Sequence, residues 1–476
     1  MKSKMKTYIT KTVMVSVFIL TFISCSISKD IETPKNVYPA TFRYASISQD
    51  SISTADLQWK DFFAEKDIIK LIDSALVRNN DLQVAQKNIE IAQLRLTQSK
   101  WGNVPQANLF VNASTNRPSE NSFTGINLNQ FLGTKHIEDY SAGVSLSWEA
   151  DIWGKIKNQK KGAYAGYLQS EEVKKALQTS IVANVAKGYY NLLMLDSQLK
   201  IARENLQLND STTFIIKLKY DAGQVTSLAI EQSEAQKLNA AQLIPLLEQN
   251  IAIEENALSV LAGSFPNSIE RTISIYSIGL KGNFTQGLPS SLLSRRPDVK
   301  SAELALKIAN ANVGIAKADL YPTLRITAST GLNSFETSNW FNIPASLFGT
   351  ALGGITQPLL NGKKMQTQFN IAKIEREKAV LDFRQVVLIA VKEVSDALVS
   401  VEKLENQEYF LNEKVKTLQK AIINANLLFK NGMADYLEVL VAQANLLQSE
   451  LELADVKRQQ LSANIELYRS LGGGWK

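Results

Sequence analysis

Apolar residues follow two different periods along this chain, and the shorter period marks four candidate strands. From Tyr140 through Val144 to Trp148 every second residue is apolar, and the residues between them are small or polar. The same alternation recurs, most weakly in the last case, in the segments near 105–115, 139–149, 322–332 and 346–357. Because a period of two places alternate side chains on opposite faces, each segment predicts a strand with one apolar face. Such strands are typical of a sheet between lipid and water or of one face of a soluble sheet.

The stretches between these segments follow the helical period. In the last stretch, apolar residues step by three and four positions from Leu437 to Tyr468, which predicts a coiled-coil seam. Only scattered glycines interrupt the helix-forming composition from Lys155 to Gly223, so a helix of about 60 residues would extend roughly 90 Å. After the N-terminal region no run reaches the roughly 18 apolar residues of a membrane-spanning helix. Any entry into a membrane therefore has to use strands, because backbone polar groups in hydrocarbon must be paired.

The order of these elements occurs twice. Asp81 and Asp298 stand near the start of two helical segments that precede strands, at an offset of 217 residues (298 − 81). Gly223 and Gly432 end two long helical segments at an offset of 209 (432 − 223). Each half predicts a helix, a strand, a long loop, a strand and two long helices joined by a turn. The expected segments are a leader at 1–24, an N-terminal segment at 25–63, a first repeat at 64–263 with its turn at 220–225, a linker at 264–296, a second repeat at 297–470 with its turn at 429–434, and a tail at 471–476.

Composition excludes several classes of function for this chain. The 476 residues include 52 Lys and Arg against 46 Asp and Glu, and four of the lysines lie in the N-terminal leader. This near-neutral balance argues against nucleic acid as a partner. One Cys and one His exclude a disulfide framework and a Cys/His zinc site. No motif marks a nucleotide-binding loop or a catalytic cluster, so we expect no enzyme activity, no metal and no cofactor.

The N-terminus has the form of a secretory leader. Lysines precede an apolar run from Thr12 to Ile23 that, at about twelve residues, is too short to span a bilayer. The run ends in Phe22-Ile23-Ser24-Cys25, which resembles the bacterial lipoprotein box, so Cys25 is expected to carry the lipid. Ser26 in place of Asp implies sorting to the outer membrane. The alternative is an ordinary secretory leader with an incidental cysteine.

Several motifs resemble those of one known family. They are Ser147-Trp-Glu-Ala-Asp-Ile-Trp-Gly-Lys155, Arg295-Arg-Pro-Asp-Val-Lys-Ser-Ala-Glu303 and Tyr436-Leu-Glu-Val-Leu440. Together with the duplication, they are similar to the outer-membrane efflux lipoproteins of the TolC superfamily, in its OprM/NodT branch, over residues 25–475. The resemblance implies an α+β membrane protein, a homotrimer whose 12-stranded transmembrane β-barrel, four strands per chain, continues into a long periplasmic α-helical barrel. It also implies that the lipid-anchored N-terminal segment at 25–63 and the linker at 264–296 lie at the equator of this channel. Four strands alone cannot close, since roughly eight form the smallest known barrel.

The function implied by the resemblance is that of an exit duct. The channel would be the outer-membrane component of a tripartite efflux pump that exports drugs or other toxic small molecules. Its partners would be a periplasmic adaptor protein, an inner-membrane pump of the resistance-nodulation-division type, and outer-membrane lipid. Two alternatives stay open: an exit duct for type I protein secretion or metal export, and a lipid-anchored coiled-coil scaffold without a pore.

The two turns between the long helices are candidate contacts for the adaptor. They contain Tyr220 and Gly223 in the first repeat, and Phe429 and Gly432 in the second. Glycine tolerates the positive φ of a tight reversal between helices, so these turns are expected to be periplasmic tips. The alternative is that each glycine only caps its helix.

Acidic residues beside the second turn are candidates for a gate. Asp435 and Glu438 are three residues apart and hence share one helix face, and Glu438 matches the acid of the family's tip segment. Three copies would form a carboxylate ring at the aperture that selects cations, aided by Asp221 and Gln443. The alternative is that both acids are solvated residues favoured by the helix dipole.

Overall fold

The computed structural model describes residues 42–43, 57–279 and 295–476, which form two compact units. The first unit contains Ile91–Tyr167 and Leu304–Val380, and the described parts of Lys35–Glu90, Leu168–Glu303 and Leu381–Lys476 make up the second. The leader and Cys25 lie outside the described residues. Each unit therefore takes a segment from both halves of the chain.

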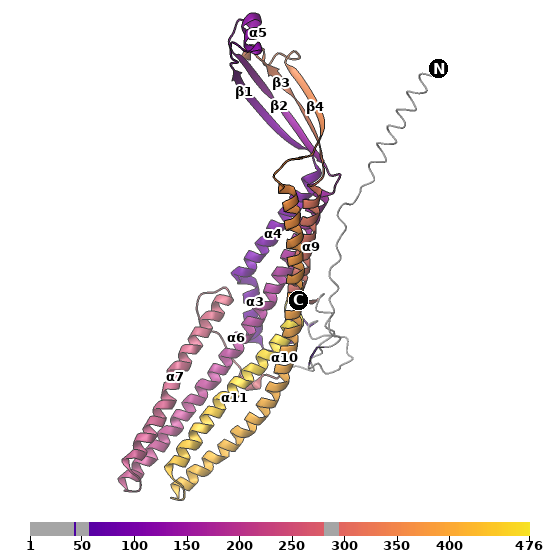
Figure 1. The fold of residues 1–476 in the computed structure, drawn as a ribbon. Coiled ribbons are helices and arrows are strands. Elements are labelled where there is room, and N and C mark those ends of the chain that lie inside the picture. Colours follow the sequence, from indigo (N-terminus) through magenta and orange to yellow (C-terminus); the bar gives the residue numbers. More distant parts are fainter. Residues whose placement is uncertain (1–41, 44–56, 280–294) are drawn as a thin grey trace. The chain divides into compact units, whose positions relative to one another are not determined.

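The first unit contains one antiparallel sheet whose strands follow the order of the sequence (Figure 1). The strands are β1 (Gln106–Asn116), β2 (Ile137–Ala150), β3 (Thr323–Ser334) and β4 (Leu347–Thr356). Strand β2 of the first repeat pairs with β3 of the second, with Leu146 opposite Ala328. All four strands predicted from the period of two are confirmed, including the weakly alternating fourth.

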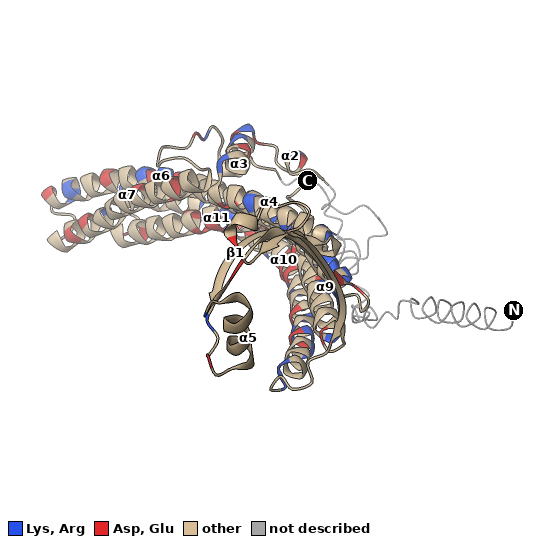
Figure 2. Cartoon of the chain, turned by 90° about the horizontal axis from the view of Figure 1, so that it is seen from above, with Lys and Arg blue, Asp and Glu red and all other residues tan. Residues whose placement is uncertain are grey.

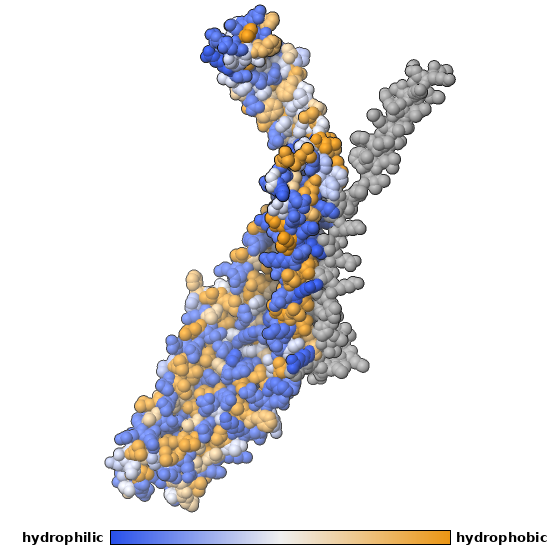
Figure 3. Space-filling model, viewed as in Figure 1, coloured by the Kyte–Doolittle hydropathy of each residue, from blue (hydrophilic) through white to orange (hydrophobic). Residues whose placement is uncertain are grey.

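One face of the sheet is apolar, as the alternation predicts. Leu109 pairs with Val144 across β1 and β2, and Leu324 pairs with Ile355 across β3 and β4. The side chains of Leu109 and Ile355 are 79% and 73% exposed, so this face is uncovered in the single chain. Figure 3 shows apolar and weakly polar residues over the strands and hydrophilic residues gathered at the end that carries helix α5 (Phe123–Leu132).

The helices have equal lengths in the two repeats. The long helices α6 (Lys155–Asp221) and α10 (Lys364–Lys430) have 67 residues each, and the return helices α7 (Ser227–Leu261) and α11 (Tyr436–Ser470) have 35 each. The structure thus contains the duplication that the sequence predicts. The shorter helices are α2 (Trp59–Phe62), α3 (Lys66–Arg78), α4 (Asn80–Lys100) and α9 (Pro297–Ala318). Among the described residues, no helix is long and apolar enough to cross a membrane.

Helix α11 is buried on two sides, whereas the heptad pattern predicts one seam. Leu461 and Ile465 of that seam pack in a core with residues of α6 such as Val185. Leu446 and Leu453, which the pattern omits, pack instead against residues of α10. The helix therefore has a neighbour on each side, and its second buried face fills with residues outside the heptad.

The connection between β1 and β2 contains a helix that the sequence interpretation treated as a long polar loop. Helix α5 (Phe123–Leu132) begins after Ser122, whose Oγ accepts a hydrogen bond of 3.1 Å from the Gly125 N–H. Gly133 ends it with φ = 63°. Both ends thus carry ordinary capping residues.

Candidate functional site

The two turns expected to be tips have the same backbone geometry. Gly223 and Gly432 have φ values of 71° and 72°. In the first turn the Gly223 N–H donates to the Tyr220 carbonyl at 2.8 Å, and the Gln224 N–H donates to the Lys219 carbonyl at 2.8 Å. Equivalent bonds close the second turn, so both helices end in the Schellman motif. A Cβ atom added at either glycine would meet no atom within 4 Å, so the outer side of each turn is open.

Side chains from both hairpins meet in one cluster beside these turns. Its buried members are Ile216, Ala229, Phe429, Tyr436, Val439 and Leu440. The Lys219 ammonium group donates to the Phe429 carbonyl at 2.7 Å and lies 4.3 Å from the centre of the Phe429 ring. The Tyr436 hydroxyl donates to Gln232 Oε1 at 2.8 Å. We call these two polar contacts the tip clamp, because they join α6 to α10 and α7 to α11.

The acidic residues expected at an aperture occupy the start of α11 and the end of α6. Asp435 is the N-cap of α11, and its carboxylate accepts a hydrogen bond of 2.8 Å from the Tyr436 N–H. Glu438 lies in the first turn of α11 and is exposed, as is Asp221, the last residue of α6. Asp435 therefore caps the start of α11, and its exposed position also leaves it accessible from outside the chain.

Two of the expected residues occupy positions that do not fit the roles assigned from sequence. Gln443 is fully buried, and its amide donates to Thr212 Oγ1 at 2.7 Å, so its side chain cannot line an aperture. Phe429 is only 3% exposed because its ring fills the cluster beside the turns, so it is not an exposed partner contact. Tyr220, at 45% exposure, keeps an accessible side chain.

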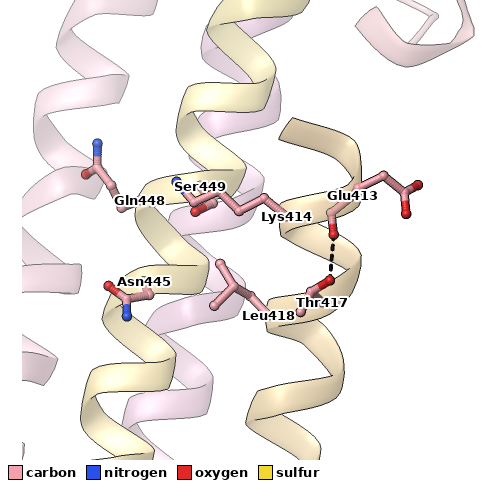
Figure 4. A pocket seen from close by; sticks show the side chains of 7 residues that line it. All are labelled: Glu413, Lys414, Thr417, Leu418, Asn445, Gln448 and Ser449. Carbon is pink, nitrogen blue, oxygen red and sulfur yellow. Dashed lines mark hydrogen bonds between the residues drawn. The ribbon is translucent and has the colours of Figure 1, made fainter. Parts of the chain in front are cut away.

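A pocket of about 530 Å³ lies farther along the second hairpin, between α10 and α11 (Figure 4). Figure 4 shows Leu418 and Lys414 extending from α10 toward Asn445 and Ser449 of α11. Thr417 turns away and donates to the Glu413 carbonyl at 2.8 Å. The Ser449 hydroxyl is buried without a hydrogen-bond partner in the protein. The pocket, lined mainly by polar side chains, thus lies beside the apolar contacts between α10 and α11.

Charged side chains in the sheet are confined to the strand ends. Glu138 and Asp139 lie near one end of β2, and Glu149 of β2 and Arg325 of β3 lie near the other, where their charged groups approach to 3.6 Å. Within the four described strands no charged residue lies between these ends. Figure 2 shows the contrast with the helices, which carry charges along their length. A charge-free band with one apolar face is suited to a hydrocarbon layer.

Sequence interpretation missed the role of a buried arginine at the start of the second repeat. Arg296 is 3% exposed, and its guanidinium group donates to Asp298 at 2.6 Å and 3.0 Å. It also lies 2.8 Å from a Glu393 carboxylate oxygen of α10 and donates to the Ser470 carbonyl at the end of α11 at 3.1 Å. One side chain thus joins the start of α9, the middle of α10 and the end of α11. The only signal in the sequence was its place in a family motif.

These features together define a class of protein. A duplicated chain with two long helical hairpins, and with a sheet that has one apolar face and no charged residue between its strand ends, has the architecture of a subunit of an outer-membrane export channel. The family model "Outer membrane efflux protein" matches residues 71–264 and 288–473. The chain belongs to this family, and the predicted TolC-like fold class and channel function are confirmed.

Individual relatives match over almost their full length. The cation efflux system protein CusC of Escherichia coli O6:H1 is 29% identical over 463 residues, covering 96% of this chain and 97% of the relative. The toluene efflux pump outer membrane protein TtgC of Pseudomonas putida is 28% identical over 474 residues, covering 97% and 96%. The open-state crystal structure of the Neisseria gonorrhoeae MtrE outer membrane channel superimposes with a TM-score of 0.84 at 26% identity, covering 95% of this chain and 99% of the other.

Proposed function

We propose that three copies of this chain form the outer-membrane exit duct of a tripartite efflux pump. The observation that carries the proposal is the sheet, which has one apolar face, one polar face and a charge-free middle. Strands β1 and β4 are its edges, and each has an unpaired side in the single chain. In hydrocarbon an unpaired edge costs several kcal/mol per backbone group, which favours pairing β1 of one copy with β4 of the next. Three copies give 12 strands, enough to surround a lumen.

The partners and cargo follow from the shape and the family. A duct without an energy source needs an energised partner, so we propose an inner-membrane resistance-nodulation-division pump joined through a periplasmic adaptor. CusC is named for cation efflux and TtgC for toluene efflux, and the two are almost equally similar to this chain. We propose drugs or other toxic small molecules as the cargo. Export of cations is the alternative that the similarity to CusC favours.

Asp435 and Glu438 are proposed to form a cation-selective ring of carboxylates at the periplasmic aperture. Asp221 would lie close to this ring, and the tip clamp would stabilise the nearly closed resting state of the aperture. Purified protein in a planar bilayer should conduct ions and prefer cations. The double variant Asp435→Asn and Glu438→Gln should lose most of that preference, because the carboxylates supply the field at the opening. Asparagine still caps the helix, so α11 keeps its start. Reversal potentials in a salt gradient measure the preference.

Glu452→Gln is the matched control, because it removes one carboxylate from the same helix farther from the turn. It should leave selectivity unchanged. A conducting double variant with wild-type selectivity would contradict the gate but not the duct. A wild-type protein that never conducts would contradict the duct itself and favour the lipid-anchored scaffold.

A lipid on Cys25 is proposed as the anchor in the outer membrane. The proposal rests on the lipoprotein-like sequence before Cys25, which lies outside the described residues. Cells given radioactive palmitate should label the wild-type protein and leave Cys25→Ser unlabelled. Some of the variant should still reach the outer membrane, since the strands insert independently of one lipid chain. Equal labelling of both proteins would place the lipid elsewhere.

A further inference from the structure

Two phenylalanines and the two glycines between them form a row across the polar face of the sheet. In the strand register, Phe110 of β1 pairs with Gly143, Gly143 pairs with Gly331, and Gly331 pairs with Phe348 of β4. The two phenylalanines are thus three strand spacings apart, or about 14 Å at the usual spacing. Their ring centres nevertheless lie 6.5 Å apart, with the rings tilted by 49°. Both rings therefore lean inward over the two glycines.

The two glycines make this arrangement possible. A Cβ atom at Gly143 would lie 3.1 Å from the Phe110 ring and 2.3 Å from the Thr330 carbonyl oxygen. At Gly331 it would lie 2.1 Å from the Ala142 carbonyl oxygen and 2.6 Å from the Gly143 Cα. No larger residue fits at either position without moving the backbone. Between Phe110 and Phe348 the two central strands therefore carry no side chain on this face, and the rings lie over their backbone.

Phe110 and Phe348 form an apolar patch on an otherwise mostly polar face. The neighbours of Phe110 on this face of β1 are Asn108 and Asn112, and the neighbour of Phe348 in β4 is Thr350, whose hydroxyl lies 2.6 Å from that of Ser329. Leu352 adds apolar surface two residues beyond Thr350. Both rings are only partly buried, so one side of each can be touched from the space above the face. Phe110, Gly143 and Gly331 lie inside their strands, and Phe348 is the second residue of β4, which carries no charged residue.

We propose that Phe110 and Phe348 are selectivity-determining residues of the exit duct, where they contact aromatic and apolar cargo during its passage. The inference rests on the proposed duct, in which the polar face lines the lumen and three copies bring three ring pairs to one depth. Ring contacts of this kind change binding about two- to tenfold. Such weak contacts favour entry of a ring-bearing molecule without trapping it, as conduction requires.

The test compares two blockers of equal charge in single-channel recordings of the full-length protein. Benzyltrimethylammonium carries a ring, and tetramethylammonium does not. The wild-type channel should be blocked by the ring-bearing ion at a concentration about two- to tenfold lower. The double variant Phe110→Leu and Phe348→Leu keeps apolar bulk but removes both rings, and it should be blocked equally by the two ions. Asn112→Ala, on the same face of β1, is the control and should keep the wild-type ratio.

Each outcome has one meaning. A conducting leucine double variant that keeps the wild-type ratio overturns the aromatic contact and leaves the duct intact. A wild-type channel that conducts without any preference for the ring-bearing ion also overturns it. Absence of all conductance in the wild type instead contradicts the proposed duct. If the double variant fails to assemble, Phe110→Leu and Phe348→Leu are recorded singly, and each should lose part of the preference; an unchanged ratio in both overturns the contact.

Discussion

Replacing Arg296 with methionine should lower the free energy of unfolding by about 3 kcal/mol, because it removes one partner from a buried ionic cluster. Methionine keeps most of the apolar stem but donates no hydrogen bond to Asp298 or to the Ser470 carbonyl. The lower end of the usual range is expected, since Asp298 is 43% exposed and Glu393 keeps a second ion pair of 3.1 Å with Arg469. Denaturant titration of the purified protein in detergent, followed by circular dichroism, measures the loss.

Arg458→Met is the matched control for this change. Arg458 pairs with Asp455 three residues earlier on the same helix, and both side chains are partly exposed. Such a pair contributes about 0.5 kcal/mol, so its loss should hardly shift the transition. Equal effects of the two substitutions would show that Arg296 does not stabilise the packing of α9 with α10 and α11.

The same cluster predicts a dependence on pH. Burial alone would raise the pKa of Asp298, but the hydrogen bonds and charge of Arg296, with backbone N–H groups of Val299 and Asp298, outweigh burial and hold the pKa below its ordinary value of 3.8. A carboxyl whose pKa is lower in the folded state stabilises that state above the pKa of the unfolded chain. This contribution is therefore present above about pH 4 and lost as the pH falls further. Arg296→Met should flatten the acid limb of the stability curve.

The sequence was most informative where one period governs a long segment. Four strands alternate because one face of the sheet contacts a different medium from the other, and the pattern survives even in Leu347–Thr356, where it is weakest. The internal repeat predicted the long helices equally well, since Gly223 and Gly432 mark helix ends that are closed by the same pattern of hydrogen bonds. Helix α5 was missed although Ser122 and Gly133 flank it, because the polar composition of the loop hid these capping residues.

Side-chain burial was harder to predict, because it depends on which neighbours surround a helix. Gln443 and Phe429 look like exposed residues near a turn, yet one is hydrogen-bonded inside the packing of α6 against α11 and the other fills the cluster beside the turns. A heptad pattern reports one face of α11, and the second buried face includes polar residues that no hydrophobic period detects. The pairing of Arg296 with Glu393 joins residues 97 positions apart (393 − 296), so no local pattern contains it.

Gly223→Trp and Gly432→Trp should abolish efflux while trimers still assemble, if the two turns dock a periplasmic adaptor. At these φ values any side chain strains the backbone, at a cost of roughly 1–2 kcal/mol. The added atoms meet open space, so the indole would project outward from the turn and block a partner without disturbing the hairpin. The minimal inhibitory concentrations of exported compounds, in cells with the matching adaptor and pump, should fall to those of cells without the channel.

Two controls separate docking from backbone strain and from bulk. Gly223→Ala and Gly432→Ala carry the same strain without the indole, so resistance should persist in both. Gly133→Trp places the same indole on a glycine with φ = 63° and no atom within 4 Å of the added Cβ, but at the end of α5 instead of at a tip. It should leave resistance unchanged. Full resistance in both tip tryptophan variants would contradict docking at the turns, whereas equal loss in the alanine variants would assign the effect to the strained turn itself.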